Sequence, residues 1–377
     1  MIPIAKPFLD EAEAMAAHDT ILSGWITQGP KVQEFEEKFA AYTGSEYAVA
    51  VSNCTTGLHL AMLVAGIGPG DEVICPSMSY IATANCIVYC GATPVFAEIN
   101  PLTYNLDIHD VKARITPKTK AILLVHQIGM PADIDAFTAL AKERDLILIE
   151  DAACAAGSEY KGKRIGCHSD LVCFSFHPRK VISTGDGGMV TTSRADFAAR
   201  MKLLRQHGMS ITDRVRHGSS KIVFEDHLEV AYNYRLTDIQ AAVGIKQLEK
   251  LDRIVEGRRN IARQYHQLLG DIDCIRLPEE PQGCISNWQS YSIYLLNRAP
   301  IDRNELMQRM LDAGVSTRRG IMTSHRETAY VKRNGIISLP VTEDACDRSI
   351  IIPLYVPMSD DDVNTVALTF RKCLLGE

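Results

Sequence analysis

Short apolar runs alternate with helix-like stretches between about residue 45 and residue 192. Runs of Val, Ile, Leu and Phe between turn residues predict buried strands, and apolar residues at i, i+3 and i+4 predict helices. Alternation at this spacing predicts a mostly parallel seven-stranded sheet covered by helices on both faces. The predicted strands are Tyr47–Val51, Glu72–Cys75, Pro94–Ala97, Ala121–His126, Leu146–Glu150, Leu171–Phe174 and Met189–Thr192, and the helices between them are Thr55–Val64, Ile81–Cys90 and Ile134–Arg144.

The pattern changes near Asp238, where a long helical segment begins. A Pro-rich break at 277–281 separates that segment from an alternating stretch typical of a strand. We therefore expect a large α/β domain over residues 1–238, with an N-terminal helical segment, and a smaller α+β domain over residues 239–377. The predicted elements of the second domain are helices Asp238–Leu269, Asp302–Ala313 and Asp360–Leu375 and a strand at Trp288–Leu296.

Composition and charge exclude several classes of protein. The chain has 377 residues, is 46% hydrophobic, and carries a formal charge of -6, so no basic surface for nucleic acid is expected. No apolar run approaches the about 20 residues that cross a bilayer, and the start lacks a secretory leader, so we expect a cytoplasmic protein without a membrane partner. The 11 cysteines form no CxxC pair and no zinc-like cluster, so we expect reduced thiols and no metal site.

Polar residues follow five of the predicted strands, at the edge where such sheets bind ligands. We therefore predict one site at the carboxyl ends of the strands, made of residues from several loops. The residues concerned include Thr55, Thr56, Tyr80, His126, Asp151 and Ser175.

Lys180 defines the chemistry of that site. It lies five residues after Ser175 and just before the sequence Thr184-Gly185-Asp186-Gly187-Gly188, which we interpret as a tight turn. A lysine forms a Schiff base only if its amine is partly neutral, so we expect a desolvated pocket or a nearby cation to lower its pKa. Asp151 ends a buried strand and could keep a pyridine nitrogen protonated. Together they indicate pyridoxal phosphate chemistry.

Each of the other positions has a plain structural alternative. Thr55 and Thr56 stand where a helix N-terminus attracts a phosphate, but the same residues could simply cap the helix. Tyr80 could stack on a flat cofactor ring or fill a domain seam. His126 could carry a proton or be a hydrogen-bonded structural residue. Asp151 on its own could cap a helix, and its combination with Lys180 favours the cofactor.

These motifs resemble the DegT-type (StrS-like) nucleotide-sugar aminotransferases, which have the aspartate aminotransferase fold (fold type I) of pyridoxal phosphate enzymes. The resemblance covers nearly the whole chain. It is carried by Gly29-Pro30, Ser52-Asn53-Cys54-Thr55-Thr56-Gly57, Gly91-Ala92-Thr93-Pro94, Glu150-Asp151-Ala152-Ala153, Ser175-Phe176 with Lys180, Arg205-Gln206-His207-Gly208, Asn233-Tyr234-Arg235 and Arg318-Arg319.

The resemblance implies a role for each matching residue. Lys180 would form the Schiff base with pyridoxal 5'-phosphate (PLP) and carry the proton, Asp151 would pair with the pyridine nitrogen, and Tyr80 would stack on the ring. Asn233 would reach the phosphate from the second subunit, which implies a homodimer with shared active sites. The remaining phosphate contacts would be Thr55, Thr56 and Ser175.

Two positions depart from the family pattern. Cys154 stands where the family usually has Gln beside the phenolic oxygen of the cofactor, and a thiol is a weaker hydrogen-bond partner. Cys54 stands where a Gly usually precedes the phosphate-binding Thr. We therefore expect an altered environment for the cofactor ring.

The implied reaction moves an amine from L-glutamate to PLP, giving pyridoxamine phosphate (PMP), and then to a nucleotide-linked keto-sugar. The stretch Asn287-Trp288-Gln289 and the pair Arg318-Arg319 resemble perosamine-synthase-type relatives, which aminate C4 of a 4-keto-6-deoxyhexose. Such products enter amino-sugar and cell-surface polysaccharide biosynthesis, including lipopolysaccharide O-antigen. Candidate substrate contacts are His126, Arg318, His325 and the loop 211–225.

Two other readings stay open. Some relatives dehydrate sugars on the same fold and replace the Schiff-base lysine with histidine, and a non-catalytic regulatory protein would lack the lysine or the aspartate. Lys180 and Asp151 are both present, which favours the aminotransferase.

Overall fold

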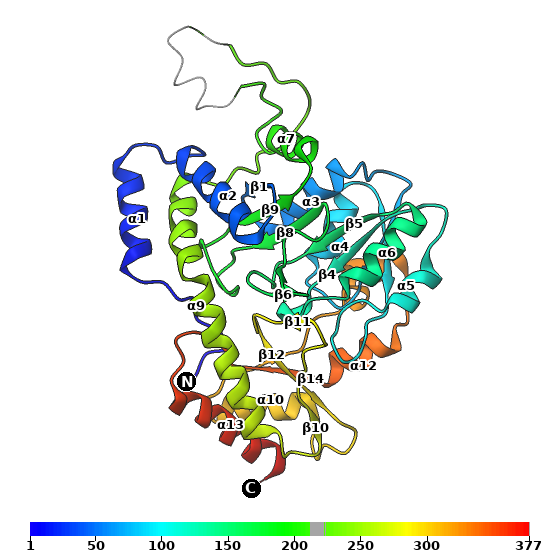
Figure 1. Ribbon diagram of the computed structural model, residues 1–377. Helices are drawn as coiled ribbons and strands as arrows, with labels where there is room; N and C mark the ends of the chain where they lie inside the picture. Colours follow the sequence, from blue (N-terminus) through cyan, green and yellow to red (C-terminus); the bar gives the residue numbers. More distant parts are fainter. Residues whose placement is uncertain (212–221, 223, 377) are drawn as a thin grey trace.

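A seven-stranded sheet forms the centre of the large unit (Figure 1). The structure is a computed structural model that describes residues 1–211, 222 and 224–376. The strand order is β1-β9-β8-β5-β4-β2-β3. The strands are β1 (Tyr47–Val51), β2 (Glu72–Pro76), β3 (Thr93–Ala97), β4 (Thr119–Val125), β5 (Ile147–Asp151), β8 (Leu171–Ser175) and β9 (Gly188–Thr192). All seven predicted strands are confirmed.

The sheet is parallel except for β9, which pairs antiparallel with both β1 and β8. Apolar side chains fill both of its faces: in β1, Ala48 and Ala50 belong to one buried cluster, and Val49 and Val51 belong to another. The first cluster includes residues of α2 (Pro30–Thr43), α5 (Ile108–Arg114), α6 (Ile134–Arg144) and α9, and the second includes residues of α3 (Cys54–Val64), α4 (Ala82–Tyr89) and α7 (Ala195–Leu204). The predicted doubly covered sheet is therefore confirmed.

Helix α9 (Asp238–Leu269) is 32 residues long and runs from the large unit into the small one (Figure 1). Thr237 and Gln240 form a capping box at its start, which fixes the N-terminus next to the predicted boundary. Ile245 and Leu251 belong to the core of the large unit, and Tyr265 and Leu269 belong to the core of the small unit. The helix thus contributes to both cores, and the division at residue 238 stays a prediction. Helix α1 (Glu11–Leu22) lies along it.

The small unit is built on a four-stranded antiparallel sheet of order β10-β12-β14-β13. The strand predicted at 288–296 is present as β12 (Tyr291–Leu295), and the two predicted helices are present as α10 (Arg303–Asp312) and α13 (Asp360–Leu375). The other elements were not predicted; they are β10 (Ile275–Arg276), β13 (Arg318–Arg319), β14 (Ser349–Ile352), α11 (Thr328–Asn334), α12 (Pro340–Arg348) and a small sheet of β11 (Cys284–Ile285), β6 (Glu159–Tyr160) and β7 (Lys163–Arg164).

No helix in the described part of the chain is long and apolar enough to cross a membrane. The described residues likewise contain no group of three or more His, Cys, Asp or Glu side chains arranged to hold a metal ion.

Candidate active site

Lys180 and Cys154 meet at the carboxyl ends of two neighbouring strands. Cys154 follows β5 and Lys180 follows β8, and these strands are adjacent in the sheet. The Lys180 Nζ donates a hydrogen bond of 3.1 Å to the Cys154 Sγ, and both residues are half-buried. The folding of parallel strands therefore joins two residues that are 26 positions apart.

Asp151 is the last residue of β5 and is only 5% exposed. Its carboxylate accepts hydrogen bonds from the Thr83 hydroxyl at 2.8 Å and from the Ala153 backbone N–H at 3.1 Å. Burial nevertheless raises the pKa of Asp151, because these two bonds and the charge of Lys180 only partly offset the cost of desolvating the carboxylate. The site therefore holds a buried acid that lacks a direct cationic partner among the described residues.

Thr83 was missed by the sequence analysis. It lies in the first turn of α4, and its hydroxyl also contacts the Ser79 hydroxyl at 2.7 Å. The signal was a hydroxyl at the start of the helix that follows Tyr80, one of the predicted cofactor residues.

The expected lowering of the Lys180 pKa is wrong. Burial pushes the pKa of Lys180 down, but Cys154, Asp151 and Cys54 act in the opposite direction and leave the pKa raised. The surrounding residues are acids and thiols, and their combined effect on the pKa of Lys180 outweighs desolvation. A nearby cation was the second route that we expected, and none contributes to this shift.

Thr55 and Thr56, the predicted phosphate contacts, lie in the first turn of α3. Asn53 caps this helix: its side chain accepts from the Thr56 N–H at 3.0 Å, and the Thr56 hydroxyl donates to the Asn53 carbonyl at 2.8 Å. The capping alternative is thus present for Thr56, while Thr55 is half-buried beside it. A Cβ atom on Gly188 would lie 2.6 Å from the Asn53 carbonyl carbon, so only glycine allows β9 to approach this turn.

The remaining predicted site residues differ in how far they are exposed to solvent. Ser175 is 8% exposed, and its Oγ accepts from the His177 N–H at 3.4 Å. Tyr80 exposes 67% of its surface, so in this chain it does not fill a domain seam. Asn233 and Arg318 are exposed.

His126 is fully buried and hydrogen-bonded within the chain. Its Nε2 lies 2.8 Å from the Glu150 Oε2, and its Nδ1 accepts from the Ala132 N–H at 3.1 Å. Both ring nitrogens are therefore occupied, which removes His126 from the candidate substrate contacts and agrees with the structural alternative.

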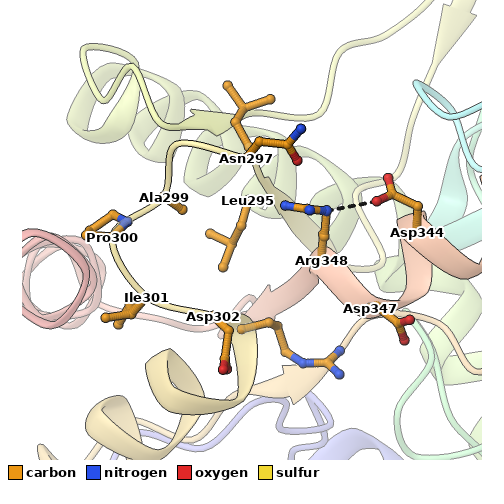
Figure 2. Close-up of a pocket in the computed structure, with 11 residues that line it drawn as sticks. Leu295, Asn297, Ala299, Pro300, Ile301, Asp302, Asp344, Asp347 and Arg348 are labelled. Carbon is orange, nitrogen blue, oxygen red and sulfur yellow. Dashed lines mark hydrogen bonds and ion pairs between the residues drawn. The ribbon is translucent and has the colours of Figure 1, made fainter.

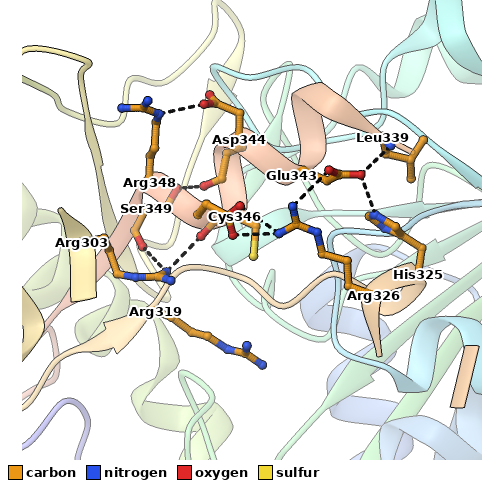
Figure 3. A network of polar contacts seen from close by, with 12 residues as sticks. Arg303, Arg319, His325, Arg326, Leu339, Glu343, Asp344, Cys346, Arg348 and Ser349 are labelled. Atoms are coloured by element: carbon orange, nitrogen blue, oxygen red, sulfur yellow. Dashed lines mark hydrogen bonds and ion pairs between the residues drawn. The ribbon is translucent and has the colours of Figure 1, made fainter. Parts of the chain in front are cut away.

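His325 is likewise only 2% exposed, and both of its ring nitrogens have partners. Figure 3 shows its contact with Glu343. Its Nδ1 lies 2.6 Å from the Ser77 Oγ, and its Nε2 lies 3.2 Å from Glu343. Arg326 binds the same Glu343 at 3.1 Å. This network fastens the loop after β2 to the small unit, so His325 also leaves the list of substrate contacts.

Asn287 joins the small unit to the Lys180 site and was not predicted as a site residue. Its side-chain amide donates to the backbone carbonyls of Cys154 and Ala156, both at 2.8 Å. Two residues later, the Gln289 amide donates to the Arg179 carbonyl at 3.0 Å. The segment therefore holds the backbone next to both partners of the Lys180–Cys154 contact. The sequence analysis used the stretch Asn287-Trp288-Gln289 only to predict the type of substrate, and not to predict a contact with the Lys180 site.

A pocket of about 480 Å³ lies elsewhere, on the small unit (Figure 2). Its lining includes Leu295, Asp302 and Arg348, and Arg348 pairs with Asp344 at 2.8 Å. None of the predicted site residues lines it. The predicted sugar-binding loop 211–225 falls largely outside the described residues.

The residues at the strand ends fit PLP. Asp151 is a buried carboxylate that could pair with the protonated pyridine nitrogen of PLP. Lys180 has the amine that could react with the aldehyde of PLP. The first turn of α3 offers backbone N–H groups to a phosphate. The fold and these residues define a class: the PLP-dependent transferases of fold type I.

Comparison with known proteins agrees with this class. A family model described as the DegT/DnrJ/EryC1/StrS aminotransferase family matches residues 7–371. The uncharacterized protein MJ1066 of Methanocaldococcus jannaschii is 37% identical over 374 residues, which is 98% of this chain and 97% of that protein.

Two solved structures superpose over nearly the whole chain. The aminotransferase TlmJ of Streptoalloteichus hindustanus has a TM-score of 0.92 at 35% identity, covering 100% of this chain and 99% of its own. Spr1654, a proposed sugar aminotransferase of Streptococcus pneumoniae, has a TM-score of 0.93 in its PMP form at 29% identity, covering 99% of both chains. A PLP form of Spr1654 is also similar.

The chain belongs to the DegT/DnrJ/EryC1/StrS aminotransferase family. It is a PLP-dependent aminotransferase of the sugar aminotransferase type.

Proposed function

We propose that the protein transfers the amino group of L-glutamate to a nucleotide-linked keto-deoxysugar, with C4 of a 4-keto-6-deoxyhexose as the acceptor carbon. The observation that carries the proposal is the placement of Lys180 and Asp151 on the ends of adjacent strands in a chain of this family. The product would serve amino-sugar or cell-surface polysaccharide biosynthesis.

Lys180 would hold PLP and move a proton at the reacting carbon. When bound, PLP supplies an electron sink for the carbanion that forms when this proton leaves. Asp151 would keep the pyridine nitrogen protonated, and the bonds from Thr83 and Ala153 orient its carboxylate for this role. Tyr80 would cover the ring and exclude water.

Thr55, Thr56 and Ser175 would hold the phosphate together with the N–H groups at the start of α3. Cys154 would stand beside the phenolic oxygen of the ring. Its distance of 3.1 Å from the Lys180 Nζ supports this position, because the amine must also reach the ring.

Arg318 would bind an anionic group of the substrate. Desolvation of its guanidinium group and then the charge of the nearby Arg179 lower the pKa of Arg318, although the residue as a whole is exposed. An anion between the two guanidinium groups would relieve the repulsion between them. The candidates are the diphosphate of the nucleotide and the carboxylates of L-glutamate.

The active site would be shared between two copies, with Asn233 reaching the phosphate of the partner. Val230 and Leu228, close in sequence to Asn233, expose 97% and 60% of their surfaces. A second subunit would cover these apolar side chains. Mixing Lys180→Ala and Asn233→Ala subunits tests the arrangement. Because each mixed dimer would hold one intact site, activity should return to roughly a quarter of wild type. No recovery despite mixed dimers would refute sharing.

The substrate is tested with a panel of nucleotide-linked 3-keto and 4-keto sugars, each incubated with L-glutamate and analysed by mass spectrometry. We expect an amino-sugar from the 4-keto-6-deoxyhexoses, formed about 10²–10⁴-fold more slowly with Lys180→Ala. Amination of only the 3-keto sugars would contradict the C4 assignment, and dehydrated products without nitrogen would contradict amino transfer.

A further inference from the structure

Cys154 differs from the other cysteines because its sulfur contacts an amine. The distance between the Lys180 Nζ and the Cys154 Sγ is 3.1 Å. Other thiols bond to backbone carbonyls; Cys86, for example, donates to the Thr83 carbonyl and Cys167 to the Arg164 carbonyl. Among the described residues, Cys154 is the one cysteine hydrogen-bonded to a lysine.

Both residues of the pair keep part of their surface exposed. Cys154 and Lys180 are both half-buried, whereas the neighbouring Cys54 is buried. Thiolates that combine partial exposure with a cationic neighbour are the ones that oxidants attack. Two nucleophilic atoms, the Cys154 Sγ and the Lys180 Nζ, therefore lie in contact.

We propose that hydrogen peroxide converts Cys154 and Lys180 into a reversible sulfur–nitrogen cross-link whenever the lysine amine is free. In the first step the Cys154 thiolate attacks one peroxide oxygen. An S–O bond forms, the O–O bond breaks, and the second oxygen leaves as hydroxide, which takes a proton from the Lys180 ammonium to give water and the neutral amine. Sulfur loses two electrons, and peroxide gains them.

In the second step the neutral Lys180 amine attacks the sulfenic sulfur. An S–N bond forms, the S–O bond breaks, and the oxygen leaves as water with a proton from the amine. The sum is one thiol, one amine and one hydrogen peroxide giving one S–N bond and two waters. The reactants need little movement, because the two atoms already lie at hydrogen-bond distance.

The first step prepares the second. Hydroxide released in the first step accepts the proton of Lys180, and burial then favours the neutral form of this amine. The neutral amine lies at hydrogen-bond distance from the sulfur that it attacks.

The cross-link consumes the amine that PLP requires. A thiol reductant restores both side chains by attacking the sulfur, so the modification would act as a reversible block on cofactor loading. PLP bound to Lys180 would protect the pair, because the amine is then unavailable. This consequence rests on the proposed role of Lys180, whereas the cross-link itself rests only on the contact.

Intact-mass and peptide analysis of the full cofactor-free chain with hydrogen peroxide tests the cross-link. We expect the mass to fall by about 2 Da, a peptide linking Cys154 to Lys180, and reversal by dithiothreitol. Cys154→Ser should abolish the link. In Lys180→Ala, Cys154 should instead progress to the sulfinic acid, a gain of about 32 Da. Cys167→Ser and Cys373→Ser replace other half-buried cysteines and should leave the link unchanged.

Oxygen addition to Cys154 without a link to Lys180 in the wild-type chain would overturn the proposal, and so would a link that persists in Cys154→Ser. Circular dichroism of each variant establishes that it is folded. The PLP-loaded enzyme forms a separate arm, in which we expect protection. If the loaded enzyme cross-links as fast as the cofactor-free chain, the cross-link stands, and the assignment of Lys180 as the PLP attachment point fails.

Discussion

The Thr83 hydroxyl donates a hydrogen bond of 2.8 Å to the Asp151 carboxylate, across 68 residues of sequence. Thr83 is 1% exposed and also contacts Ser79, so its orientation is fixed by the fold. This bond holds in place the acid that we assign to the pyridine nitrogen.

Thr83→Val keeps the shape of the side chain and removes the hydroxyl. We expect kcat/KM to fall about 10- to 150-fold, since a hydrogen bond to a charged group contributes roughly 1.5–3 kcal/mol. Thr83→Ser restores the donor and should recover most of the loss. Equal rates for Thr83→Val and wild type in steady-state assays would show that Asp151 does not depend on this contact.

Asp151→Asn should inactivate the enzyme and yet stabilise the cofactor-free chain. Burial raises the pKa of Asp151 in the folded state, so the folded chain binds this proton more tightly than the unfolded chain does. Stability is therefore present at low pH and is lost as pH rises from the unfolded pKa through the raised folded pKa. The amide carries no charge and escapes this loss.

Melting curves of both cofactor-free proteins between pH 4 and pH 8 check this sign. We expect the Tm of Asp151→Asn minus that of wild type to grow by a few degrees as pH rises, at roughly 2 °C per kcal/mol for a chain of this size. A difference that shrinks with pH would mean that the native site favours the carboxylate. Far-UV spectra provide the check that both proteins share the same secondary structure.

Asn287→Ala should loosen the Lys180 site. The substitution leaves the carbonyls of Cys154 and Ala156 without their donor, and a buried group left unbonded costs about 1–3 kcal/mol. We expect a lower Tm together with weaker PLP binding, measured by cofactor titration. Asn297→Ala, at an exposed position, serves as the matched control. Unchanged PLP affinity would confine Asn287 to a role in stability.

Much of the large unit could be predicted, because its strands are buried on both faces and their apolar runs stand out from the sequence. The direction of β9 could not be, since an apolar run carries no information about orientation. Strands as short as β10 and β13 have two residues each and show no periodicity. Their positions follow from packing in three dimensions.

Some features of the site could likewise be predicted from the sequence, and others could not. Lys180 and Asp151 could be predicted because each follows a strand of a parallel sheet, and such ends share one edge. The Lys180–Cys154 and Thr83–Asp151 contacts depend on side-chain positions that no local pattern encodes. The raised pKa of Lys180 escaped prediction for a related reason: it depends on the acids that folding gathers around the amine.

The central claim is that Lys180 binds the cofactor covalently. Borohydride reduction of the PLP-loaded enzyme, followed by peptide mass spectrometry, tests it most directly. The account predicts one reduced cofactor adduct, located on Lys180, and a Lys180→Ala variant that lacks the adduct and turns over about 10²–10⁴-fold more slowly. An adduct on another lysine of the wild-type enzyme, or an undiminished adduct in the variant, would contradict it.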